Sequence, residues 1–313
     1  MAGAVAALLV ACGGPPPAAP RSAPTSTAEI TPTPGTRHQH TGDPHVMLIV
    51  LQTREVSDLA GSAAAPRINQ LAQRYGTATH AYATAHPELL DYMELFTGTT
   101  GGFSTDCATC DIGYAPTFID QIAKRSVGWR AFMDGLPQAC DTRAVVGSYV
   151  RLHNPFAYSN QLRLTPSNCQ RVVPLWLLGT DLEANSVPAF VWISPDLCDG
   201  GTVCSTAASD HWLAGIVDEV QHSAWYRDDG VIIVTWDQGT TTAGCCNRAA
   251  GGHIPLIVIS DTLRSGTHVD TPVDQAGILR SLEDVYRVPH LGDAACACSG
   301  SIAPLLAPYT AHG

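Results

Sequence analysis

Positive charge is scarce in this sequence. Its 313 residues include 17 Lys and Arg against 28 Asp and Glu, so the formal net charge is −11 at pH 7. A nucleic-acid-binding surface needs an excess of basic side chains, and this deficit argues against that class of function. Charged residues of both signs amount to only 14% of the chain, whereas hydrophobic residues reach 45%, enough for a large core.

Internal repeats and long apolar runs are also missing. Ala4–Ala11 is apolar but too short to span a bilayer, and we expect no spanning helix after Cys12. Leu9–Cys12 resembles the lipobox of a bacterial lipoprotein signal, which makes residues 1–12 the signal and Cys12 the lipid anchor. A signal peptide has Lys or Arg before its apolar run, and none precedes this one. A disordered Ala-rich terminus is therefore the alternative.

Cysteine, by contrast, is abundant. Eleven cysteines are many for a cytosolic enzyme and indicate an oxidising compartment, so we expect an exported protein, either a cell-envelope lipoprotein or a secreted one. Residues 13–44, rich in Pro, Ala, Ser and Thr, predict a disordered tether. The folded domain is therefore expected over residues 45–313.

Apolar runs and helical periodicities alternate through this domain. Val46–Leu51 is an uninterrupted apolar run that predicts a strand buried on both faces, and Gln52 and Thr53 stand at its carboxyl end. Further strands are expected over residues 129–133, 144–150, 190–193, 231–236 and 254–259, and helices over 65–75, 88–96, 117–124, 210–225 and 275–286. This order predicts an α/β fold with a mostly parallel central sheet and helices on both faces. In such folds ligands bind beyond the carboxyl ends of the strands, the edge where Gln52 lies.

Several short stretches occur in the order seen in one known family. They are residues 45–50, 65–71, 86–87 with Tyr92, 149–156, 195–198, 210–213, 234–237, 253–255 and 277–286. On these stretches the chain resembles the bacterial phosphoesterase family of the alkaline phosphatase superfamily, which includes secreted acid phosphatases and phospholipase C-type enzymes. The resemblance implies an alkaline phosphatase-like fold and hydrolysis of phosphate esters. It also implies a divalent metal held by carboxylates and a hydroxyl nucleophile.

The positions that would hold the metal and the nucleophile are substituted. Where the family has a Glu-Asn pair this chain has Gln52 and Thr53, and half of a later acidic pair is Gln238, after Asp237. The position of the nucleophilic threonine is Ala85, which has no nucleophilic atom. Loss of ligand charge should weaken the binding of a hard cation, so we expect a weak metal site or none.

Other positions of the resemblance are also changed. Where the family has a serine this chain has Glu88, and where it has an asparagine this chain has Asp91. Thr202-Val203 stand in place of a His-Asp pair, and Asp274-Gln275 stand in place of an Asn-His pair. What remains of the family's site is His86, Asp91, His153, Asn154, Asp237 and His253. The catalytic candidates among these are His86, His153, Asp237 and His253. Glu88 and Asp91 are candidate ligands of a rearranged metal site near Asp237.

Two functions remain open on this evidence. The first is a catalytically impaired or non-catalytic relative that needs no cofactor and binds a phosphorylated ligand or a protein partner in the cleft. The alternative is an active phosphoric ester hydrolase with a divalent metal in a rearranged site. A third, weaker hypothesis is a purely structural envelope protein. The membrane would be contacted through the lipid anchor only.

The cysteines are expected to form structural disulfides. The resemblance implies a Cys198–Cys204 bridge, and we also expect Cys140–Cys169 and Cys107–Cys110. Redox chemistry is the alternative for the last pair, which has C-x-x-C spacing. The remaining four, Cys245, Cys246, Cys296 and Cys298, are predicted to pair across two loops, with a zinc site as the alternative.

Overall fold

A central sheet of eight strands positions everything else in the folded domain. The structure, a computed structural model, describes residues 42–246, 248–306 and 309; Cys12 and almost all of the expected tether lie outside these residues. The strands stand in the order β12-β2-β11-β9-β1-β8-β4-β7. Their bounds are β1 Val46–Leu51, β2 Gly76–Ala78, β4 Trp129–Met133, β7 Val172–Pro174, β8 Phe190–Ser194, β9 Val231–Trp236, β11 Leu256–Ile259 and β12 His268–Val269.

The sheet is mostly parallel, as predicted. Strand β1 pairs in parallel with β8 on one side and β9 on the other, and β4 continues the parallel order to β7. Among the described strands of this sheet only β11 runs against its neighbours β9 and β2. All six residues of β1 are buried, because a strand in the middle of a sheet covered on both faces has no solvent-facing side.

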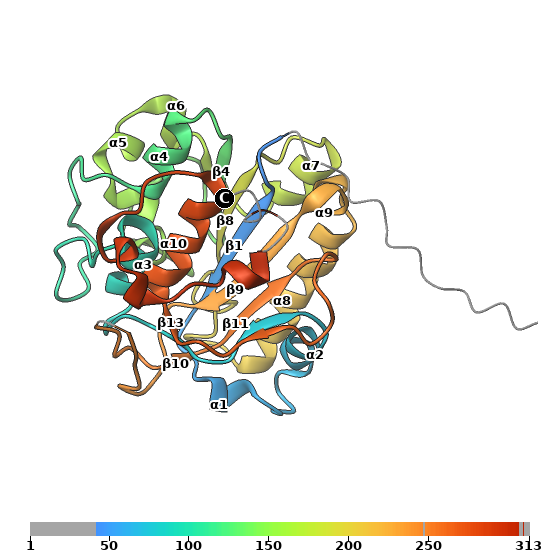
Figure 1. Cartoon of the computed structure of the whole chain (residues 1–313). Coiled ribbons are helices and arrows are strands. Elements are labelled where there is room, and N and C mark those ends of the chain that lie inside the picture. Colours follow the sequence, from blue (N-terminus) through green and yellow to red (C-terminus); the bar gives the residue numbers. More distant parts are fainter. Residues whose placement is uncertain (1–41, 247, 307–308, 310–313) are drawn as a thin grey trace, which may run out of the picture. The chain divides into compact units, whose positions relative to one another are not determined.

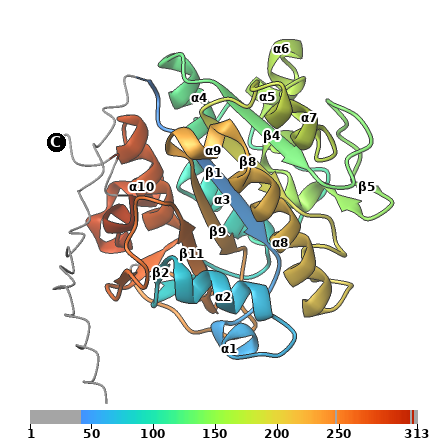
Figure 2. The same cartoon turned by 90° about the vertical axis from the view of Figure 1, so that its right-hand side faces the viewer.

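Helices cover the two faces of the sheet (Figures 1 and 2). One face carries α2 Pro66–Arg74, α8 Thr206–Gln221 and α9 Ala224–Asp229, and the other carries α3 Leu89–Thr97, α4 Phe118–Lys124 and α10 Gln275–Tyr286. The smaller helices are α1 Val56–Leu59, α5 Asn160–Arg163, α6 Pro166–Cys169 and α7 Leu177–Glu183, with 3₁₀ turns at 151–153, 155–158, 292–295, 297–299 and 303–306. No helix of the described residues has the length and hydrophobicity that crossing a bilayer requires.

Three sequence-based elements are corrected by the structure. The strand expected over 254–259 is divided into β10 His253–Ile254 and β11 Leu256–Ile259, which belong to different sheets. Residues 144–150, expected to be one strand, form a hairpin of β5 Val145–Val146 and β6 Tyr149–Val150 around Gly147, whose φ is +58°. The helix expected over 210–225 begins at Thr206 and ends at Gln221, because Ser223 caps a new helix, α9. A second, three-stranded sheet was not predicted, and it consists of β10 His253–Ile254, β3 Ala81–Tyr82 and β13 Val273–Asp274.

Three disulfides have the pairing that the sequence predicts. The structure joins Cys107 to Cys110, Cys140 to Cys169 and Cys198 to Cys204. The last of these closes the loop that follows β8 and that carries Gly200 and Thr202. A disulfide of this kind restricts the loop in the unfolded chain and so favours the folded arrangement.

The predicted pairing of the last four cysteines across two loops is corrected. In the structure Cys245 pairs with Cys246 and Cys296 pairs with Cys298, so each bridge stays within its own loop. With all four sulfurs in disulfides, the zinc alternative has no thiolate ligands here either. The two loops nevertheless meet, because Arg248 forms an ion pair with Asp293. The two loops are therefore joined by an ion pair and not by the predicted disulfides.

Helix α3 is buried along its whole length and carries an acidic residue in the core. Glu94 is 0% exposed, and neither carboxylate oxygen has a hydrogen-bond partner. Desolvation, assisted by the negative charges of Asp293 and Asp274, raises the pKa of Glu94 from 4.5 to about 8. The folded protein therefore retains a proton that the unfolded chain releases above pH 4.5, so stability falls as the pH rises through this interval.

Replacement of this carboxyl by an apolar group should remove that pH dependence. Because one pKa unit corresponds to about 1.4 kcal/mol, we expect Glu94→Met to be more stable than the parent at pH 8 by on the order of 2–4 kcal/mol. The difference should shrink toward pH 4.5. Urea unfolding at several pH values measures it, with exposed Glu183→Met as the control. Equal pH dependence in parent and Glu94→Met would show that Glu94 is already ionised in the fold.

Close packing of α10 gives a second stability prediction. A Cβ atom on Gly277 would lie 2.1 Å from the Ser299 carbonyl oxygen and 2.7 Å from Cγ2 of Val273. Gly277→Ala should therefore cost about 2–3 kcal/mol through overpacking. Gly215 in α8 is the matched control, because a Cβ there has no atom within 4 Å, and Gly215→Ala should add about 0.5–1 kcal/mol through helix propensity. Equal urea midpoints for the two variants would contradict the packing argument.

Candidate functional site

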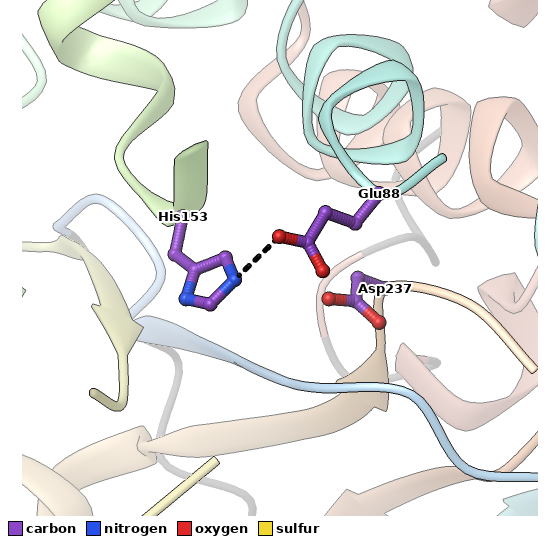
Figure 3. Close-up of side chains that lie close together, drawn as sticks. All are labelled: Glu88, His153 and Asp237. Carbon is purple, nitrogen blue, oxygen red and sulfur yellow. Dashed lines mark hydrogen bonds and ion pairs between the residues drawn. The ribbon is translucent and has the colours of Figure 1, made fainter. Parts of the chain in front are cut away.

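The site lies where β1 and β9 end side by side. Leu51 pairs with Trp236, so the next residues, Gln52 and Asp237, emerge at the same edge of the sheet. Glu88, at the start of α3, and His153, in a 3₁₀ turn, approach this edge from other parts of the chain. The ligand-type atoms of Glu88, His153 and Asp237 all lie within 4.8 Å of one another (Figure 3).

Gln52 is 0% exposed and uses both ends of its amide within the protein. Its Oε1 accepts a hydrogen bond from the hydroxyl of Thr202 at 2.7 Å. Its Nε2 donates to the carbonyl oxygens of Pro195 and Asp196 at 3.1 and 3.0 Å. A Cβ at Gly200 would lie 2.1 Å from Cδ of Gln52, so only glycine leaves room for this side chain. The amide therefore ties β1 to the loop after β8.

The same amide determines the proton position on His153. Gln52 Nε2 lies 2.8 Å from Nδ1 of His153, and an amide nitrogen can only donate. The imidazole therefore has its proton on Nε2, from which it donates to Oε1 of Glu88 at 3.0 Å. The ring also stacks on Tyr92, with centroids 5.4 Å apart. These contacts fix the orientation of the Glu88 carboxylate, whose side chain is 16% exposed.

Asp237 uses one carboxylate oxygen and leaves the other free. Oδ1 accepts from the backbone N–H groups of Thr53 and Gln238 at 2.8 and 2.5 Å. Oδ2 is buried without a partner in the described residues. Burial, and then the negative charge of Glu88, raise the pKa of Asp237 well above its usual value. Thr53 has φ of +20°, which is strained for a β-branched residue, and this conformation aims its N–H at Asp237.

The substituted positions also contact one another. Gln238 donates from Nε2 to the hydroxyl of Thr53 at 3.3 Å, just as Gln52 is joined to Thr202. Oε1 of Gln238 lies 2.5 Å from Nδ1 of His86, whose Nε2 contacts the Thr241 carbonyl oxygen at 2.8 Å. Each residue that replaces an inherited ligand is therefore held by hydrogen bonds to protein groups.

Asp91 and the substituted residue Gln275 hold the backbone beside the nucleophile position. Oδ1 of Asp91 accepts from the N–H groups of Thr84 and Ala85 at 2.9 and 3.0 Å, and Oε1 of Gln275 accepts from Thr84 at 2.9 Å. Nε2 of Gln275 donates to the Asp237 carbonyl oxygen at 2.5 Å. Burial, and then the charge of Asp237, raise the pKa of Asp91 well above its usual value. Asp91, a predicted candidate ligand, thus acts on the backbone, whereas Glu88 reaches the cluster.

His253 and Asn154, two of the surviving positions, lie outside the cluster. Nε2 of His253 contacts the carbonyl oxygen of Thr79 at 2.8 Å, and its ring stacks on Tyr82. Asn154 donates to the hydroxyl of Tyr149 at 3.0 Å. These contacts hold neighbouring chain segments together.

Glu55 is a residue of the site region that the sequence reasoning missed. Its Oε1 accepts from the N–H groups of Thr240 and Thr241 and from the Thr241 hydroxyl, at 2.8–3.0 Å. Its Oε2 accepts from the N–H of His253 at 3.0 Å. Glu55 therefore organises the loop after β9, whose Thr241 contacts His86. The available signal was a capping box, Glu55 with Asp58, immediately after the first buried strand.

The inherited metal positions do not fit a divalent ion in this arrangement. The Gln52 amide oxygen is occupied by Thr202, and its nitrogen is held by two carbonyl oxygens. Gln238 is similarly occupied by Thr53 and His86. By the resemblance, amides stand at two positions where the family has carboxylates. The two negative charges that would balance a divalent cation are therefore not supplied by these positions. Of these metal positions, Asp237 is the one whose carboxylate has an oxygen, Oδ2, with no hydrogen-bond partner in the described residues.

Comparisons with known proteins show the family and the fold of this chain. The sequence profile of the Phosphoesterase family matches residues 56–289. The phosphatidylinositol-3-phosphatase of Mycobacterium tuberculosis is 25% identical over 255 residues, which cover 80% of this chain and 79% of that protein. An acid phosphatase of Aspergillus niger is 24% identical over 258 residues, which cover 78% of this chain and 60% of that protein.

Solved structures resemble the chain in fold. A phosphonate monoester hydrolase from Silicibacter pomeroyi superposes with a TM-score of 0.54 at 13% identity, covering 87% of this chain and 77% of that one. A protein of the alkaline phosphatase superfamily from Vibrio parahaemolyticus superposes with a TM-score of 0.54 at 14% identity, covering 82% and 71%. At these identities the likeness concerns the fold alone. Because the family profile extends over most of the folded domain, this chain belongs to the Phosphoesterase family.

Proposed function

We propose that this protein binds a ligand in the inherited cleft and does not hydrolyse phosphate esters by the family mechanism. The observation that carries the proposal is the set of hydrogen bonds among the substituted residues: Gln52 with Thr202, and Gln238 with Thr53 and His86. An isolated loss of one ligand would leave an unsatisfied neighbour, at a cost of about 1–3 kcal/mol. Here the replacements satisfy one another, which supports a site rebuilt for another role.

The nucleophile position supports the same proposal. Ala85 offers no atom that could attack phosphorus, and its N–H is bound by Asp91. The family mechanism needs an activated hydroxyl at this place. The neighbouring Thr84 has its N–H bound by Asp91 and Gln275, which fixes this stretch of backbone against a one-residue shift.

A direct assay tests the proposal. The full chain, produced with its disulfides formed, is incubated with p-nitrophenyl phosphate with and without added Mn²⁺, and its metal content is measured. We expect no turnover above the buffer blank, while the Aspergillus niger acid phosphatase serves as the positive control. Chelator-sensitive turnover that is lost in Asp237→Asn would overturn the proposal.

The second candidate is a hydrolase with a rearranged metal site. It is favoured by one observation, the approach of Glu88, His153 and Asp237 to within 4.8 Å of one another. The relatives named as phosphatases add to it. The assay above decides between the two candidates, because only the second requires turnover.

We also propose that the protein is exported and tethered to the cell envelope through Cys12. Five disulfides in the described residues support an oxidising compartment. Metabolic labelling with a palmitate analogue tests the anchor. Loss of label in Cys12→Ser is the expected result, and equal labelling of both proteins is the opposite one.

A further inference from the structure

The group formed by Glu88, His153 and Asp237 includes a carboxylate oxygen, Oδ2 of Asp237, that has no hydrogen-bond partner in the described residues. Asp237 is 0% exposed, and its Oδ2 has no hydrogen-bond partner in the described structure, whereas its Oδ1 accepts two backbone hydrogen bonds. Buried polar atoms are nearly always satisfied, and an unpaired buried oxygen points to an unrepresented partner. The Asp237 carboxylate points toward the side chains of Glu88 and His153, and one ligand-type atom of each of the three residues lies within 4.8 Å of the others (Figure 3).

The partner must be compatible with the charges around this oxygen. Glu88 brings a second carboxylate, and the described contacts of Glu88 and Asp237 include no Lys or Arg side chain. His153 donates its Nε2 proton to Glu88 because Gln52 donates to its Nδ1, so the imidazole offers no free lone pair to the cluster. A cation between the carboxyl groups of Glu88 and Asp237 would favour the ionised form of both, and its attraction to them is stronger away from bulk water.

We propose that Glu88 and Asp237 hold a small cation, with His153 as the residue that positions Glu88. This inference rests on the proposed function, since it names the ligand of the same cleft. Carboxylate oxygens suit hard divalent ions such as Mn²⁺, and a protonated primary amine offers the same positive charge. The site would then differ from the inherited one in its ligands, because Gln52, Thr53 and Gln238 take no part.

Exposure defines how a cation would enter. The Glu88 side chain is 16% exposed, whereas Asp237 is 0% exposed. Glu88 is therefore the more solvent-accessible of the two acidic residues. A free phosphate entering by this route would meet the negative charge of Glu88 first, so phosphate should not bind without a cation.

Binding measurements on the full chain test the inference. Mn²⁺, methylammonium and inorganic phosphate are each titrated by calorimetry, and the shift in thermal midpoint is recorded in parallel. Binding of Mn²⁺ alone identifies a metal ion, binding of methylammonium alone identifies an amine, and binding of both identifies recognition of charge. All three support the inference. Binding of neither cation, or of phosphate alone, overturns it.

Matched variants locate the site. Asp237→Asn keeps an oxygen for the two backbone donors and removes the charge, and Glu88→Gln keeps the acceptor for His153. Each should weaken cation binding at least about tenfold, since each removes one of two charged ligands. Asp218→Asn, an exposed residue of α8, removes the same charge elsewhere and should leave binding unchanged. If Asp237→Asn does not fold, Glu88→Gln alone decides. Equal affinities of the parent and Glu88→Gln would overturn the inference.

Hydrolysis is measured on the same samples, so the two proposals can fail separately. Cation binding without turnover supports both. No cation binding and no turnover refutes the cation site and leaves the proposed function standing. Turnover that requires the bound cation refutes the proposed function and supports the second candidate.

Discussion

Gln52→Glu, which restores the inherited residue type, is expected to destabilise the protein by about 3–5 kcal/mol at pH 8. The Gln52 amide nitrogen donates to the carbonyl oxygens of Pro195 and Asp196, so a carboxylate there would place an oxygen against two acceptors. The side chain is 0% exposed, and water cannot relieve the repulsion. The Thr202 hydroxyl would remain as a donor, and Nδ1 of His153 could become a second one only with a proton on that nitrogen, which it lacks in the tautomer that donates from Nε2 to Glu88.

The effect should depend on pH in a defined direction. The introduced carboxyl is better tolerated when protonated, because its O–H can donate to one of the two carbonyl oxygens. Its pKa is raised in the fold, so the loss of stability should grow as the pH rises above the usual value for glutamate. Urea unfolding at pH 5 and pH 8 measures this, with exposed Gln161→Glu as the matched control. A Gln52→Glu protein as stable as the parent at both pH values would show that the amide donors are dispensable.

Glu55→Ala is expected to cost about 3–5 kcal/mol and to loosen the loop between β9 and β10. The carboxylate accepts hydrogen bonds from Thr240, from Thr241 twice and from His253, and the residue is only 6% exposed. Its removal leaves the N–H groups of Thr240, Thr241 and His253 without their acceptor. Because the Thr241 carbonyl oxygen contacts His86, which in turn contacts Gln238, the change should also reach the substituted residues at the end of β9.

The pH dependence expected for Glu55→Ala has the opposite sign to that expected for Gln52→Glu. Burial alone would raise the pKa of Glu55, but the hydrogen bonds from Thr241, Thr240 and His253 lower it below 4.5. The carboxylate therefore stabilises the fold above pH 4.5, and its contribution is lost as the pH falls through the folded-state value. The difference between parent and Glu55→Ala should be full at pH 7 and smaller near pH 3. Hydrogen exchange at the amides of residues 240, 241 and 253 locates the loosening, and Asp58→Ala, which removes only the α1 cap, is the control. Unchanged exchange at these amides would refute the role of Glu55.

Much of the architecture was predictable because it depends on local pattern. The apolar run Val46–Leu51 forms the central strand, and the alternation of strands and helices predicts the mostly parallel sheet that the structure contains. The exceptions have local causes as well. Ser223 caps a new helix inside the stretch expected to be one helix, and Gly147 turns an expected strand into a hairpin. These stop signals were present in the sequence and were outweighed by the apolar periodicity around them.

The site was predictable in its chemistry but not in its contacts. The sequence shows that Ala85 carries no nucleophile and that positions 52 and 238 carry amides. It cannot show that Gln52 joins Thr202, because these residues are 150 positions apart and meet only through the register of β1 and β8. For the same reason Glu55 was missed and the pairing of the last four cysteines was misjudged.

The sequence by itself therefore determined the fold class, the family resemblance and the absence of a side-chain hydroxyl at position 85, since these rest on residue identity and short-range periodicity. Tertiary structure alone decided which groups satisfy the substituted residues, which carboxylate oxygen remains unpaired and which candidate ligands reach it. The physical reason is that hydrogen bonding and desolvation depend on distances of about 3 Å between distant chain segments. Such distances are set by strand register and loop closure, which no local pattern encodes.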